Sequence, residues 1–159
     1  METIQNLIGV LKSQLTLLEE LNTLIENEKF YITHWEIDKV IEVAKQKDTI
    51  IYKDRMLDEA KEKYIKKYCN QFNIEGSTLS DVIAAIDDKN IKAELITLKE
   101  KITELASKIY SENMAIKILY STNLRLISDF FDKIGLPTST LYSNSGIKKG
   151  KTASFTKSA

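Results

Sequence analysis

An apolar repeat that runs through six heptads constrains this chain more than any other feature. Between residues 91 and 130 apolar side chains recur at alternating spacings of four and three, and only Glu112 and Asn123 interrupt them. Such a repeat predicts one helix over about residues 90–134, packed against partner helices as in a coiled coil. Gly135 and Pro137 predict where it stops. The repeating residues are Ile91, Leu95, Leu98, Ile102, Leu105, Ile109, Ile116, Leu119, Leu126 and Phe130.

A first helix is expected over about residues 3–29. A stripe of Ile and Leu residues at spacings of three and four runs from Ile4 to Ile25, and it is broad enough for a buried face. The segment FYITHW then supplies β-branched and aromatic residues in place of helix formers, so we expect the helix to end just before it.

A second helix is expected over about residues 34–72. Thr33 and Glu36 stand at the spacing of a capping box, which predicts a helix start near His34. One apolar set comprises Ile37, Ala44, Ile51, Ile65 and Phe72, and a neighbouring set comprises Val43, Ile50, Leu57 and Tyr64. Charged residues, Lys47, Asp54 and Lys61, lie between the two sets, so we expect this helix to pack less tightly.

The stretch NIEGSTLS, residues 73–80, is typical of a loop. Thr78 and Asp81 then predict the cap of a short helix over about residues 79–86. Asp88 or Asn90 is expected to open the long last helix.

These helices and their short connections predict an all-α fold, an elongated antiparallel three-helix bundle with one long C-terminal helix. We expect the bundle to span residues 1–137 and a flexible tail to span residues 138–159. The whole chain has a net charge of zero, but no acidic residue follows Asp132. The tail is basic, with Lys148, Lys149, Lys151 and Lys157, which suits a solvated arm on an acidic body.

The residue types needed for catalysis or metal binding are scarce. Cys69 and His34 are the only cysteine and histidine, too few for a disulfide within the chain or a zinc site. No glycine-rich phosphate loop and no Glu-x-x-His pair of a di-iron bundle occurs. We interpret Cys69 as a packing residue, His34 as a helix-start residue over an aromatic contact, and Asp87 and Asp88 as acids at a helix start. The sequence therefore predicts a protein that is not an enzyme and that binds no cofactor.

The chain is also unlike a membrane-inserted or nucleic-acid-binding protein. No window approaches the roughly 18 uninterrupted apolar residues of a membrane-spanning helix. The N-terminus METIQNLIGV lacks the basic region of a signal peptide, so we expect a cytoplasmic protein. The zero net charge gives no reason to expect a nucleic-acid partner.

At the end of the long last helix, the apolar residues are no longer confined to one narrow stripe. From Ala115 onward apolar residues cover most of its circumference, whereas a coiled-coil seam needs about two positions in seven. Two interpretations stay open: the other helices and the FYITHW aromatics enclose this end, or part of it is exposed to bind an amphipathic partner helix. A membrane-surface helix is a third, less favoured because the polar face carries Ser, Thr, Asp and a single Arg125.

Residues 113–150 resemble a known family. The helix end NMAIKILYSTNLRLISDFFDKIG is followed, after a short break, by TLYSNSGIKKG. This arrangement resembles the C-terminal signature of flagellar export chaperones of the FlgN type, in which a long last helix with a buried or half-buried asparagine precedes a Thr-Leu-Tyr-Gly-x-x-Gly-like element and basic residues. The matching residues are Thr140, Leu141, Tyr142 and Gly146, and Ser143 stands where glycine is more usual.

The resemblance implies a cytoplasmic, non-catalytic chaperone without a cofactor, either a monomer or a weak homo-oligomer. It would hold hook-filament junction proteins before type III export, capture the client's C-terminal helix and deliver it to the export gate. Leu141 and Tyr142 would contact the cytoplasmic domain of that gate. The residues implied to cover the client helix are Leu119, Leu126, Ile127, Phe130, Phe131 and Ile134.

A different class of protein also fits the repeat. In a generic coiled-coil adaptor or structural protein, the long last helix would form a homodimer and the tail would have no role. A stable dimer that binds no junction protein would favour this alternative.

Overall fold

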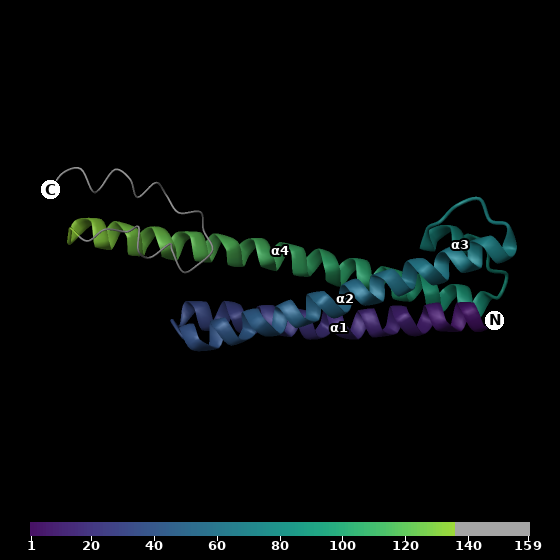
Figure 1. Ribbon diagram of the computed structural model, residues 1–159, viewed down its shortest axis with the longest axis horizontal. Helices are drawn as coiled ribbons and strands as arrows, with labels where there is room; N and C mark the ends of the chain where they lie inside the picture. Colours follow the sequence, from purple (N-terminus) through teal and green to yellow (C-terminus); the bar gives the residue numbers. More distant parts are fainter. Residues whose placement is uncertain (136–159) are drawn as a thin grey trace. The chain divides into compact units, whose positions relative to one another are not determined.

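The structure is a computed structural model, and it describes residues 1–135. Within this range the chain forms four helices and no strand, so the predicted all-α fold is confirmed. The helices are α1 (Glu2–Thr33), α2 (Ile37–Phe72), α3 (Leu79–Ala85) and α4 (Lys89–Lys133), shown in Figure 1.

The contacts within the chain define two units, which are described separately. The first unit is Met1–Ile116, and it contains α1, α2, α3 and the first part of α4. The second begins at Lys117, and the structure describes it as far as Gly135. The expected boundary between bundle and tail, after residue 137, lies outside the described residues.

In the first unit, α1 and α2 lie side by side in opposite directions (Figure 1). The Gln14 amide of α1 donates hydrogen bonds to the carboxylates of Asp54 (3.1 Å) and Asp58 (3.4 Å) in α2. Further along α1, the Glu28 carboxylate accepts a bond from Lys47 of α2. Later residues of α1 thus meet earlier residues of α2, as the short connection predicts.

The first part of α4 runs parallel to α1. Three ion pairs join the two helices: Lys12 with Glu94 at 2.7 Å, Glu26 with Lys108 at 3.3 Å, and Lys29 with Glu112 at 2.9 Å. The partners stay 82 or 83 residues apart in sequence, so the two helices keep one register over this length.

Apolar residues of all four helices form the main core of the first unit, around α3. Leu7, Leu95 and Val82 are completely buried there. The cluster supports the interpretation of Cys69 as a packing residue, because its side chain lies in it and is only 3% exposed. The buried members of the cluster are Ile4, Leu7, Ile8, Leu11, Ile65, Tyr68, Cys69, Val82, Ile83, Ile86, Leu95 and Leu98.

The predicted boundary between the first two helices is wrong. The first helix continues through Thr33, and Thr33 does not cap α2: its hydroxyl donates to the Phe30 carbonyl of its own helix at 2.8 Å. Glu36 precedes α2 without forming a side-chain cap. Burial explains the extension, because Ile32 is only 4% exposed and its packing outweighs the weak helix preference of a β-branched residue.

The predicted caps at Thr78 and Asp88 and the predicted stop at Gly135 are confirmed, whereas Pro137 lies outside the described residues. Thr78 and Asp81 form a reciprocal capping box at the start of α3. The Asp88 carboxylate accepts from the backbone amides of Asn90 (2.8 Å) and Ile91 (3.1 Å) at the start of α4. Gly135 follows α4 in the left-handed conformation, with a φ of 77°.

The two apolar sets of α2 differ in burial in the first half of the helix, although Ile65 of the less buried set is only 4% exposed. Val43 and Ile50 are buried, but Ile37 and Ile51 of the other set are 54% and 43% exposed. Two of the three charged residues between the sets, Lys47 and Asp54, bond to α1, whereas Lys61 bonds to Asp58 of its own helix. The sequence predicted only looser packing from this interruption; the structure shows that two of the charged residues make polar contacts within the helix pair.

Candidate functional site

The sequence places the candidate site at the end of α4. Ile116 is 2% exposed, and it is the last fully buried residue of this helix. From Lys117 to Gly135, the described part of the second unit, no side chain is fully buried. The apolar residues here do not form a closed core.

Three of the predicted site residues form an exposed stripe. Leu126, Phe130 and Ile134 follow one another at spacings of four, and their exposed fractions are 59%, 59% and 53%. In a helix this spacing places successive side chains on one face. We call these three residues the α4 stripe. The structure therefore leaves exposed a continuous apolar strip at the position where the sequence predicts a partner-binding surface.

The other three predicted residues flank this stripe. Leu119, Ile127 and Phe131 are partly buried. The rings of Phe130 and Phe131 meet edge to face, with centroids 5.7 Å apart. Such an edge-to-face pair is a favourable aromatic arrangement. Asn123, which the family resemblance expects to be buried or half-buried, is partly buried.

Leu141 and Tyr142, the residues expected to contact the export gate, lie outside the described residues. The structure therefore gives no account of them.

A polar layer in the first unit lies just before the exposed part of α4. The Lys47 ammonium donates to the Glu28 carboxylate at 2.5 Å and to the Asn113 side-chain oxygen at 3.2 Å. Glu28 belongs to α1, Lys47 to α2 and Asn113 to α4, so this layer connects three helices. The exposed Lys29 and the partly buried Glu112 form an ion pair beside it.

One exposed apolar group was not identified from the sequence. Phe30, Trp35, Ile37 and Ile41, around the turn between α1 and α2, are 50–57% exposed. From the sequence, the aromatics of FYITHW are expected only as a cover for the end of the long last helix. Trp35 also has a φ of 57°, an uncommon conformation for a bulky residue.

The residues considered for chemistry have structural roles. The His34 ring stacks on Phe30 with centroids 4.0 Å apart, which confirms its aromatic contact, although it follows α1 and does not start α2. Burial raises the pKa of the Cys69 thiol, and the nearby Asp81 carboxylate adds to this. Within residues 1–135 no cluster of three His, Cys, Asp or Glu side chains could hold a metal ion.

No helix within residues 1–135 combines the length and apolar character needed to cross a membrane. This finding concerns the described helices alone.

The chain matches a known protein family. A model of the family described as FlgN protein matches residues 1–150, which is nearly the whole chain. No curated protein and no solved structure matched. The family match covers all four helices as well as the TLYSNSG segment from which the resemblance was first inferred. The chain therefore belongs to the FlgN family of flagellar export chaperones.

Proposed function

We propose that this chaperone holds hook-filament junction proteins by their C-terminal helical segment before type III export. The observation that supports the proposal most directly is the α4 stripe, three large apolar side chains more than half exposed on a member of a chaperone family. Flagellar export chaperones bind flagellar substrate proteins, and an amphipathic client helix is the partner whose shape fits such a stripe.

The size of the stripe suits a helical client. Leu126 to Ile134 spans eight residues, which is about 12 Å along a helix. A client helix with apolar residues at spacings of three and four would cover this length with two turns. Leu119, seven residues before Leu126, would extend the contact by two further turns. Covering the client helix would prevent it from associating with other exposed apolar segments before export.

Delivery would use the C-terminal segment. On this proposal Leu141 and Tyr142 contact the cytoplasmic domain of the export gate, and the protein acts in the cytoplasm as a monomer or a weak homo-oligomer without catalysis. One aromatic side chain in a short segment gives a weak and rapidly reversible contact, which suits the release of cargo.

The proposal is tested by placing a charge on the α4 stripe. Phe130→Asp should abolish capture of the C-terminal segments of junction proteins in a pull-down, because it puts a carboxylate in the apolar contact. Ser121→Asp is the matched control. It adds the same charge to α4 nine residues earlier, on the opposite side of the helix, at an exposed polar position. Tyr142→Ala should leave capture intact and reduce secretion.

Three outcomes would contradict the proposal. If Phe130→Asp unfolds the protein, Phe130 is a core residue and the client site lies elsewhere. If light scattering finds a stable dimer formed through α4 that captures no junction protein, the chain is an adaptor. If the protein binds anionic vesicles at low salt through α4, the stripe contacts a membrane surface.

A further inference from the structure

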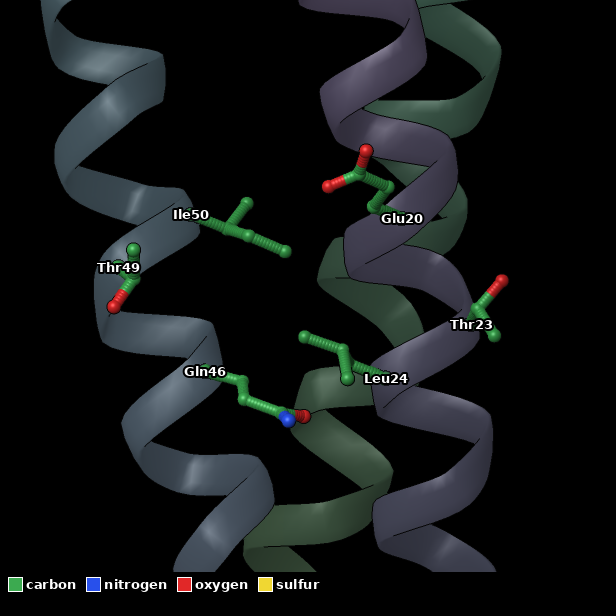
Figure 2. Close-up of a pocket in the computed structure, with 6 residues that line it drawn as sticks. All are labelled: Glu20, Thr23, Leu24, Gln46, Thr49 and Ile50. Atoms are coloured by element: carbon green, nitrogen blue, oxygen red, sulfur yellow. The ribbon is translucent and has the colours of Figure 1, made fainter.

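In the first unit, an open groove runs along the surface between the packed helices α1 and α2 (Figure 2). It consists of two adjoining cavities of about 470 and 480 Å³, both lined by Glu20 and both open to solvent. In Figure 2, Leu24 of α1 and Ile50 of α2 point toward each other across the gap. The first cavity is lined by Glu20, Thr23, Leu24, Gln46, Thr49 and Ile50. The second is lined by Ser13, Thr16, Leu17, Glu20, Lys53, Met56 and Leu57.

The apolar residues of the groove repeat every seven residues on both helices. Leu24 and Ile50 lie in one cavity, and Leu17 and Leu57 lie in the other. Seven residues correspond to about 10.5 Å along a helix, the distance between equivalent side chains of successive heptads. The two cavities are thus spaced to receive side chains at positions i and i+7 of one incoming helix.

The edges of the groove permit a partner helix to approach closely. The side chains there are mostly short or uncharged, as in Ser13, Thr16, Thr23 and Thr49. Leu17 and Ile50 are each only 7% exposed, so the groove has a firm apolar floor. Short edge residues let the backbone of a partner helix come near this floor.

The groove also carries one charge on each side. Glu20 of α1 and Lys53 of α2 line the same cavity, both are exposed, and neither forms an ion pair with another residue in the range 1–135. In coiled coils the residues that flank the apolar seam select partners through such charges. A helix that fits here has a basic residue on its edge facing α1 and an acidic residue on its edge facing α2.

We propose that the α1–α2 groove is a second helix-binding surface, separate from the α4 stripe. Its occupant is an amphipathic helix with apolar residues at i, i+3 or i+4, and i+7, a basic edge and an acidic edge. Such a helix packs into both cavities and adds to the α1–α2 pair. This surface does not depend on the client site at the end of α4.

The test uses the full-length protein and three fluorescent peptides of two to three heptads, with binding followed by anisotropy. The first has a leucine stripe with lysines along one edge and glutamates along the other. The second has the same leucines with glutamates on both edges, and in the third serines replace the leucines. We expect the first peptide to bind at least about tenfold more tightly than the other two.

Two variants locate the binding to the groove. Glu20→Lys makes both sides basic, so it should reverse the preference toward the peptide with two glutamate edges. Gln46 points into the gap in Figure 2, so Gln46→Trp fills the first cavity and should weaken binding by at least about tenfold. Thr97→Trp, at an exposed threonine of α4, is its control and should leave binding unchanged. Thermal unfolding followed by circular dichroism checks that all variants fold.

Several results would overturn this proposal. Equal binding of the leucine and serine peptides, or no change of preference with Glu20→Lys, would show that the groove does not select this helix. Loss of peptide binding with Phe130→Asp would place the peptide on the α4 stripe. A homodimer in sedimentation velocity that Gln46→Trp dissociates would make a second copy the occupant. Failure of junction-protein capture alone would affect only the proposed client site.

Discussion

Lys47 of α2 lies 2.5 Å from the carboxylate of Glu28 of α1, and both side chains are largely buried, with exposed fractions of 15% and 4%. The same ammonium reaches Asn113 of α4 at 3.2 Å. Removing two charges from water is costly, so such a pair adds little net stability, but it penalises arrangements that separate its members. The contact therefore favours the observed register of the three helices.

Removal of the ammonium should destabilise the first unit strongly. Lys47→Met removes the ammonium that pairs with the buried Glu28 carboxylate, so we expect the free energy of unfolding to fall by about 3 kcal/mol. The control is Lys45→Met, at an exposed position of the same helix, which should change it by less than about 0.5 kcal/mol. Urea unfolding followed by circular dichroism measures both.

The combined variant Glu28→Met with Lys47→Met should recover more than half of that loss, because it removes both buried charges and fills the space with apolar atoms. If the double variant is no more stable than Lys47→Met alone, the loss comes from packing and not from the charge.

The capping box of α3 should give the stability a defined pH dependence. Hydrogen bonds from the Thr78 hydroxyl and amide hold the pKa of the Asp81 carboxyl below its usual value. Its contribution is therefore present above the unfolded pKa of about 3.9 and is lost as the pH falls through the lower folded pKa. Asp81→Asn should be less stable than the parent at pH 7, with a difference that shrinks below pH 4. A difference that grows on acidification would refute this role.

Cys69 should be unreactive in the folded protein. Its side chain is 3% exposed, and burial raises the pKa of the thiol, so little thiolate is present at pH 8. Alkylation by iodoacetamide should be at least about tenfold slower in buffer than in urea. Equal rates would mean that α2 opens readily around this residue.

Local signals in the sequence identify most helix ends. The capping box of Thr78 and Asp81, the carboxylate of Asp88 and the glycine at position 135 each act on backbone groups within a few residues, so spacing alone reveals them. The same reasoning fails at Thr33 and Glu36. Burial of Ile32 extends α1 through that segment, and packing between distant residues is not visible in local spacing.

The candidate site was only partly predictable for a related reason. The heptad repeat shows which residues of α4 share a face, but it continues, with Glu112 and Asn123 as its polar interruptions, from Leu95, which is fully buried, to Leu126, which is 59% exposed. Periodicity identifies an apolar face and does not show whether another part of the chain covers it. The α1–α2 groove has the same origin, since Leu24 and Leu57 follow the pattern but stay only partly buried.

Two leucines of α4 test whether an apolar face is part of the core or an exposed surface. Leu95→Ala and Leu126→Ala make the same chemical change in α4, with the same effect on helix propensity. Leu95 is fully buried in the core, so its truncation should lower the free energy of unfolding by about 2–5 kcal/mol. Leu126 is 59% exposed, so its truncation should cost less than about 0.5 kcal/mol. Capture of junction proteins should show the reverse order, because Leu126 belongs to the α4 stripe. If Leu126→Ala destabilises the protein as much as Leu95→Ala, the repeat continues as core and the α4 stripe cannot be a binding surface.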